Sequence, residues 1–289
     1  GLLARVLTGK YCEHLPLYRQ SEIFARQGIE LSRALLSNWV DACCQLMTPL
    51  NDTLYRYVMN TRKVHTDDTP VKVLAPGRKK AKTGRIWTYV RDDRNAGSSE
   101  PPAVWFAYSP DRQGKHPVQH LRPFRGILQA DAFSGYDRLF SAEREGGALT
   151  EVACWAHARR GFADLYKISK DPRAAIAVKK IAGLYRLEKK ISSRPVEKIR
   201  QWRQRYARPI LEDLWSWLEE QEPQCSPGRA LHKAIVYALS HRVELSRFLE
   251  DGAVPLDNNV CERAIKNVVL GRKSWLFAGS QMAGERAAQ

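Results

Sequence analysis

The chain has 289 residues, 44% of them hydrophobic, so it can bury a large core as two domains or as one domain with a sizeable insertion. Its formal charge of +16 favours a polyanionic partner, nucleic acid first and an anionic membrane second. No run of about 18 apolar residues exists, which excludes a helix that spans a bilayer. The six cysteines lack paired CxxC spacing, and the first residues lack a signal-peptide pattern. We therefore expect reduced thiols in a cytosol. The sequence lacks an initial Met and ends in an open helical pattern, so we also expect it to be part of a longer protein.

Residues 1–60 are predicted to be a helical segment. Apolar side chains recur at helical spacing on both sides of Gly28, where we expect a turn. Two helices around a glycine turn are compatible with a helix-turn-helix that binds DNA. They are equally compatible with an ordinary helical hairpin that packs on the next domain.

Residues 61–155 are predicted to form the first part of an α/β core. Five short runs rich in β-branched and aromatic residues predict strands: KVHTDDTPVKVL, RIWTYVRD, AVWFAYS, GILQAD and LTEVACWA. A short helix is expected before the fourth strand and another before the fifth. This order favours a mixed five-stranded sheet with helices on its faces. The loop between the first two strands has three candidate DNA contacts, Arg78, Lys79 and Lys80.

Residues 156–252 are predicted to be an all-helical insertion, and residues 253–289 the second part of the core. Between positions 167 and 208 there are 14 Lys and Arg against 3 Asp and Glu. A solvated helix face normally mixes the two signs of charge, so we favour phosphate contact for this run over simple solvation. Pro209 is expected to kink the helix in which it lies.

Three carboxylates stand at informative places. Asp67 lies in the first predicted strand, Asp131 ends the fourth, and Glu262 lies in the first turn of the helix that follows the insertion. If the first and fourth strands are neighbours, the two aspartates meet and a helix beside them supplies the glutamate. Three acids in one place repel unless a cation joins them, and such oxygen ligands suit Mg²⁺ or Mn²⁺. Two such ions would support in-line displacement at a phosphodiester.

Each acid also has a structural interpretation. Asp67 or Asp68 could cap a turn before Thr69, and Asp131 could be a turn residue at a strand end. Glu262 could complete a variant of the capping box that begins at Asn259. The metal-site interpretation therefore depends on the three acids as a set.

Four ordered segments resemble the transposases of the insertion sequence 66 family: VHTDDTPVKVL, LQADAFSGYDRLF, EVACWAHARRGF and LDNNVCERAIKNVVLGRKSWLFAGS. The segment before them resembles the one that precedes the core in that family. The resemblance implies an RNase H-like mixed five-stranded sheet with flanking helices, interrupted by an all-α insertion and preceded by a helical segment. It also implies a zinc-binding module upstream, a carboxy-terminal extension and an Asp-Asp-Glu triad. That triad falls on Asp67, Asp131 and Glu262.

One position departs from the family pattern. The family usually has Asp-Glu-Thr where this chain has Asp67-Asp68-Thr69, so either aspartate could hold metal. We expect Asp67 to do so, because Asp68 should point to the opposite face of the strand.

Basic residues near the predicted triad are candidate DNA contacts. Cys154 and His157 have the spacing of zinc ligands, but no second pair accompanies them, so we expect Cys154 to be buried on the fifth strand. The segment resembles the Cys-x-x-His motif of several transposase groups, which implies that His157, Arg159 and Arg160 position phosphates. Four residues of the last motif would then contact the DNA backbone: Arg263, Lys266, Arg272 and Lys273. The neighbouring Asn258 and Asn259 could orient Glu262, contact DNA or cap the helix.

The resemblance and the residues together predict a DNA transposase that cleaves element ends and joins their 3′-hydroxyls to target DNA. The expected cofactor is a pair of Mg²⁺ or Mn²⁺ ions. The expected partners are double-stranded DNA and further copies of the chain, with no membrane, in the cytoplasm of a bacterium beside its nucleoid. Two alternatives are a nuclease that cuts without joining and a transposase-derived DNA-binding protein without activity.

Overall fold

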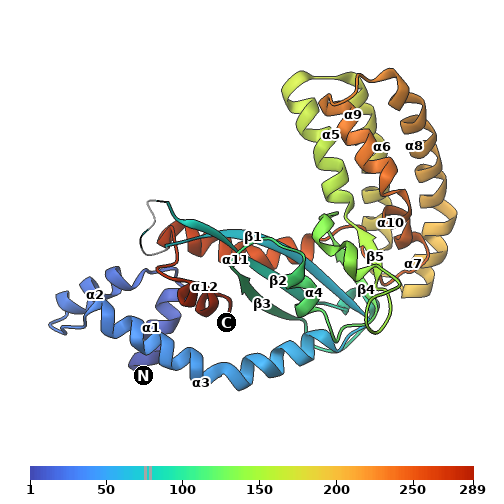
Figure 1. Cartoon of the computed structure of the whole chain (residues 1–289). Coiled ribbons are helices and arrows are strands. Elements are labelled where there is room, and N and C mark those ends of the chain that lie inside the picture. The colour runs from blue at the N-terminus through green and yellow to red at the C-terminus, as the bar shows by residue number, and fades with distance from the viewer. Residues whose placement is uncertain (75–76, 78–79) are drawn as a thin grey trace.

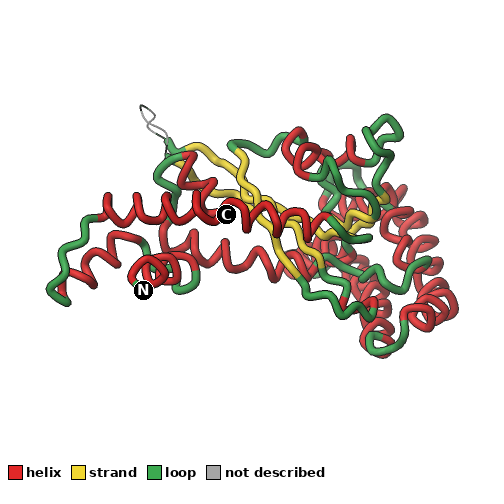
Figure 2. Tube along the Cα trace, turned by 90° about the horizontal axis from the view of Figure 1, so that it is seen from below, coloured by secondary structure: helices red, strands yellow, loops and turns green. Residues whose placement is uncertain are grey.

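In the computed structural model, which describes residues 1–74, 77 and 80–289, the chain is elongated (Figure 1). Amino-terminal helices lie at one end, a sheet occupies the middle, and a helical bundle stands at the other end. Figure 2 shows the same arrangement from below, with the strands between two helical regions. The predicted contacts Arg78 and Lys79 lie outside the described residues.

The amino-terminal segment is helical as predicted. It contains α1 (Leu2–Tyr11), α2 (Leu17–Arg26) and α3 (Arg33–Met59). Gly28 follows α2 with a φ of 80°, a left-handed conformation that favours glycine, so the expected turn is present. The first half of α3 packs against α1 and α2, and its last residues, Val58 and Met59, reach the core beneath the sheet.

The sheet has five strands in the order β3-β2-β1-β4-β5. Their bounds are β1 Lys63–Val73, β2 Lys82–Arg91, β3 Ala103–Ser109, β4 Ile127–Ala130 and β5 Thr150–Ala153. The β1 strand is antiparallel to β2 and parallel to β4, with His65 opposite Gln129. The first and fourth strands are therefore neighbours, which is the condition that the metal-site hypothesis required.

Helices cover the sheet on both faces. The helices α4 (Lys115–His120) and the end of α3 pack around Trp87, Tyr89 and Phe124 on one face. On the other face, α11 (Asn259–Trp275) packs on β1 and β2, and α12 (Gln281–Ala288) packs on β3. The helix expected between β4 and β5 is a 3-10 turn, Ser134–Leu139. The predicted α/β class, with an RNase H-like sheet arrangement, is confirmed.

The insertion is a helical bundle with its own core, which includes Phe162, Leu184 and Trp215. Its helices are α5 Trp155–Ser169, α6 Pro172–Ile191, α7 Val196–Trp202, α8 Arg208–Gln221, α9 Ala230–Ser240 and α10 Arg242–Ser246. A π-helical turn, Arg203–Ala207, separates α7 from α8 just before Pro209. This is the expected irregularity, because proline lacks the N–H that a regular helix would use there.

The fifth strand is shorter than the sequence predicted. It ends at Ala153, and Trp155 already begins α5, so Cys154 is a buried residue at the helix start rather than a strand residue. Within the described part of the chain, no helix combines the length and the apolar character needed to cross a membrane.

His120 predicts an acid-sensitive contribution to stability. Its Nδ1 shares a hydrogen bond of 2.9 Å with Tyr89 Oη, and burial lowers the pKa of His120 to about 4. An unfolded histidine has a pKa of about 6.5, so the unfolded state binds more protons between pH 6.5 and 4. Stability contributed by neutral His120 is therefore lost as the pH falls, by about 2 kcal/mol at pH 5.

Urea unfolding at pH 7.5 and pH 5 measures this contribution. A His120→Gln variant cannot titrate and should lose less stability between the two pH values than the wild type does. Equal losses in the two proteins would show that His120 is not held neutral by burial.

Candidate active site

The two predicted aspartates meet at one edge of the sheet. Asp67 lies on β1, and Asp131 directly follows β4. In the parallel register His65 is opposite Gln129, and two further residues along each strand bring Asp67 opposite Asp131. The sheet topology therefore places them side by side, as the sequence predicted.

The surroundings of both aspartates disfavour the charged form of the carboxylate. Burial, followed by the negative charge of Asp131, raises the pKa of Asp67 to about 7. Burial also raises the pKa of Asp131, although the nearby His157 and Arg112 oppose that rise. Repulsion between two partly buried carboxylates makes this edge of the sheet favourable for a cation.

Glu262 faces the same site from α11. Its negative charge contributes to the raised pKa of Asp67, and both side chains line a shallow groove of about 480 Å³. In the structure Glu262 Oε1 accepts a hydrogen bond from Arg160 Nη2 at 3.0 Å. The groove also has His157, Arg263 and Lys266 in its wall. Asp67 and Glu262 therefore share a groove whose rim is basic.

The two aspartates fit the chemistry of a divalent cation. Asp131 Oδ1 is buried and has no hydrogen-bond partner among the described residues, which leaves an oxygen available as a ligand. Carboxylate oxygens are the ligands that Mg²⁺ prefers. In the described chain no three His, Cys, Asp or Glu side chains surround one point closely enough to hold an ion. Glu262 would therefore have to move toward the aspartates to join them around a cation.

Asp68 has a different environment from Asp67. Its side chain is 0% exposed, and its two oxygens bind Arg85 at 2.9 Å and Arg112 at 2.8 Å. Two guanidinium groups therefore occupy the oxygens of Asp68. Asp67 is the aspartate that faces the groove, which is the side expected from the alternation of side chains along a strand.

The start of α11 is attached to β1 rather than closed by a capping box. The N-cap residue is Asn258, one position earlier than expected, and its side chain makes no cap hydrogen bond. Instead its amide donates to Thr66 O at 2.8 Å, and its Oδ1 accepts from His65 Nδ1 at 3.0 Å. Asn258 is fully buried, so it does not contact DNA. It fixes the start of the Glu262 helix beside Asp67.

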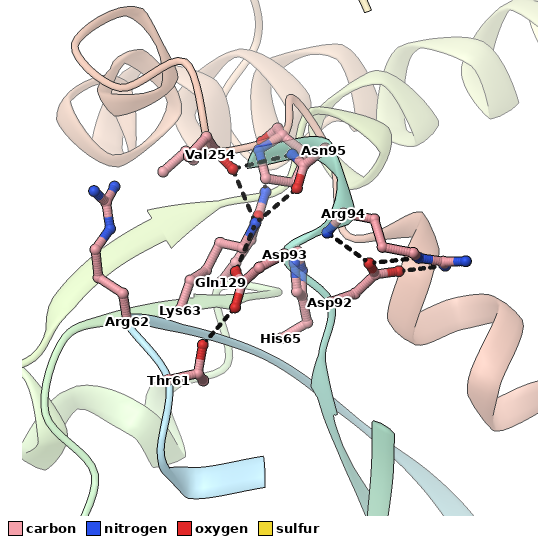
Figure 3. Close-up of polar contacts among 12 residues, drawn as sticks. Thr61, Arg62, Lys63, His65, Asp92, Asp93, Arg94, Asn95, Gln129 and Val254 are labelled. Carbon is pink, nitrogen blue, oxygen red and sulfur yellow. Dashed lines mark hydrogen bonds and ion pairs between the residues drawn. The ribbon is translucent and has the colours of Figure 1, made fainter. Parts of the chain in front are cut away.

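The segment before α11 is held through its backbone carbonyls (Figure 3). Lys63 Nζ and Asn95 Nδ2 both donate to Ala253 O, at 2.9 Å and 3.0 Å. Gln129 Nε2 donates to Pro255 O at 2.8 Å. These donors come from the sheet side of the molecule, so β1 and β4 fix the path of the chain as it returns from the insertion to the site.

The predicted DNA contacts lie partly in the groove and partly outside it. His157, Arg160, Arg263 and Lys266 line the groove, and Lys80 and Lys273 are exposed elsewhere. Arg272 donates to Thr69 Oγ1 at 2.7 Å and to Pro70 O, so it attaches α11 to β1. Arg159 lies close to Tyr185 of α6, outside the groove wall. The structure thus gathers four of these residues around Asp67 and Glu262.

The surface around the basic run of the insertion is less uniformly positive than the sequence of that run indicates. Six of its fourteen cations form ion pairs, and three of the acids that pair with them, Asp164, Asp213 and Glu250, lie outside the run. The other eight are Lys170, Lys179, Arg186, Lys189, Lys190, Arg194, Lys198 and Arg205. Phosphate contact by this surface stays a prediction for those eight.

Sequence reasoning missed Arg112 at the site. Its Nη2 lies 3.6 Å from Asp131 Oδ2, and its guanidinium carbon lies 3.8 Å from the centre of the Phe133 ring. Arg112 stands in a loop without a motif that marks it. The one available signal was Asp68, a second acid beside Asp67 that needed a positive partner.

The strand order, the acids at the junction of β1 and β4, and the inserted helical bundle define an RNase H-like protein with a helical insertion. A family model described as Transposase IS66 family matches residues 1–286, and the chain belongs to that family. Two similar proteins of Sinorhizobium fredii (strain NBRC 101917 / NGR234) are named Uncharacterized protein y4hP and Uncharacterized protein y4jD. The first is 38% identical over 100% of this chain and 54% of its own length. The second is 35% identical over 99% and 56%. The chain spans about half the length of these curated relatives.

Proposed function

We propose that this protein is the catalytic part of a DNA transposase that cleaves element ends and joins the freed 3′-hydroxyls to target DNA. The observation that supports this most is the pairing of Asp67 with Asp131 at the junction of two parallel strands, in a chain of the IS66 transposase family. A pair of Mg²⁺ or Mn²⁺ ions held there would supply charge stabilisation and an activated nucleophile for phosphoryl transfer.

The residues of the chain divide the remaining work. Asp67, Asp131 and Glu262 are the proposed metal ligands, and Asn258 holds the Glu262 helix against β1. Cleavage and joining are the same displacement with different nucleophiles, water first and the 3′-hydroxyl second, so one site serves both.

DNA is proposed to lie over the groove and its basic rim. His157, Arg160, Arg263 and Lys266 line the groove with Asp67 and Glu262 and offer N–H donors to phosphate oxygens. Lys80, Lys273 and the free cations of the insertion would extend the contact along the duplex. Because two element ends must be joined together, we propose that further copies of the chain assemble on DNA, in the bacterial cytoplasm beside the nucleoid.

A strand-transfer assay tests the proposal. The protein is given Mg²⁺, supercoiled target DNA and an element-end duplex that already has a free 3′-hydroxyl, and joined products are separated on a gel. Joined product is the expected result. Cutting without joining would instead support the nuclease alternative, and DNA binding with neither product would support an inactive DNA-binding protein.

A further inference from the structure

We infer that Arg112 contacts the DNA phosphate at the acidic site, and that Asp68 and Phe133 hold its guanidinium in place for this contact. The inference rests on the proposed function, because it requires a DNA phosphate beside Asp131. It assigns a role both to an arginine that no motif marks and to the aspartate that departs from the family pattern.

The loop that contains Arg112 is fixed before any ligand arrives. It lies between β3 and α4, and buried Trp87 donates through Nε1 to Ser109 Oγ at 2.7 Å. Ser109 Oγ donates in turn to Asp111 O at 2.6 Å, and the Asp111 carboxylate binds His116 Nε2 at 2.7 Å. Arg112 therefore projects from a short segment that is tied to the hydrophobic core.

The guanidinium is held along one edge and on one face. Nε and Nη2 both lie 2.8 Å from Asp68 Oδ1, and the group stacks on the Phe133 ring. Asp68 is itself held in place, because its side chain is 0% exposed and Arg85 binds its other oxygen at 2.9 Å. Anchoring of this kind fixes the direction of the remaining N–H groups, so little conformational entropy is lost when they bind a ligand.

The guanidinium lies beside Asp131 and is partly open to solvent. The Arg112 side chain is 37% exposed, and its Nη1 has no partner within the part of the chain that is described. Nη2 is 3.6 Å from Asp131 Oδ2, which is too far for a hydrogen bond but close enough to set Arg112 beside the acid pair. A planar guanidinium with unused N–H groups is well suited to a phosphate oxygen.

A purely structural role would be to neutralise buried Asp68. Arg85 provides a matched control for that role, because it binds the same carboxylate but does not approach Asp131. Arg85→Met and Arg112→Met each remove one positive partner of Asp68. Only Arg112→Met should remove a contact with DNA.

The experiment is a double-mutant cycle between the protein and one phosphate. The scissile phosphate is first mapped on the element-end DNA that the wild type joins to target. Binding is then measured by fluorescence anisotropy, without divalent metal, for ordinary DNA and for DNA with a neutral methylphosphonate at that position. The ratio of the two affinities gives the effect of the phosphate charge for each protein, and thermal melting verifies that each variant is folded.

We expect this ratio to differ between the wild type and Arg112→Met by about 10- to 100-fold, as for a hydrogen bond to a charged group. Asp68→Asn should shift the ratio in the same direction, and Arg85→Met should leave it at the wild-type value. If Arg112→Met does not fold, Arg112→Lys keeps the charge without the planar fork and should give an intermediate ratio. If the wild type and a folded Arg112 variant give equal ratios, the inference is overturned. Joined product from the wild type would still support the proposed function. A wild type that binds DNA but forms no product would overturn the proposed function, and the inference with it.

Discussion

The Asp131→Asn variant is expected to lose metal-dependent cleavage and joining by roughly 1000-fold, which corresponds to about 4 kcal/mol of transition-state stabilisation. An amide oxygen is a weaker ligand for Mg²⁺ than a carboxylate, and the change removes one of the two facing charges that define the site. DNA binding should be kept or slightly strengthened, because a negative charge is lost beside the groove. Gel assays of product and anisotropy of bound DNA measure the two properties separately.

Loss of folding does not account for this expected result. The pKa of Asp131 is raised by burial, so replacing its carboxylate with a neutral amide should preserve or increase the melting temperature. Asp137→Asn is the matched control, since Asp137 is an exposed aspartate in the 3-10 turn that follows Asp131. An Asp131→Asn protein that cleaves and joins DNA as the wild type does would contradict the assignment of the metal ligands.

The parts of the site that depend on strand order could be predicted from the sequence. A mixed sheet in which the first and fourth strands pair is enough to bring Asp67 to Asp131. The first strand is rich in β-branched residues, and the fourth is a short apolar run that ends at Asp131. The alternation of side chains also separated Asp67 from Asp68 correctly. Strand patterns allow few arrangements of a sheet, so these relations could be predicted from the sequence.

The parts that depend on loops and on long side chains could not be predicted. Asn258 appeared to be a capping residue, yet its bonds go to β1, which is 192 residues away in sequence. Arg112 reaches Asp68 from a loop whose path follows from Trp87 and Ser109. Cations of the insertion find acids on neighbouring helices, such as Lys180 of α6 with Asp213 of α8. Each of these contacts is set by packing between segments, and no local pattern encodes it.

Arg203 shows how the insertion contributes to the position of Glu262. It lies in the π-helical turn, is 2% exposed, and makes a two-pronged ion pair with Glu188 at 2.7 Å and 2.8 Å. Its Nη1 also donates to the carbonyls of Phe248, Asp251 and Val254 at 2.8–2.9 Å. The same stretch of chain then passes the donors on β1 and β4 and enters α11. One buried cation thus joins the bundle to the segment that leads to the site.

Arg203→Met is therefore expected to lower the free energy of unfolding by about 3–5 kcal/mol, because it leaves Glu188 and three carbonyls without their shared donor. Urea unfolding monitored by circular dichroism measures the change. Arg200→Met is the matched control, since Arg200 lies one turn earlier and pairs with Glu197 at the surface, where an ion pair adds little to stability. If both variants unfold at the same urea concentration as the wild type, the three carbonyls do not depend on Arg203 and are held by other contacts. A loss of stability in Arg203→Met alone would show that the path of the chain into α11 depends on the insertion that precedes it.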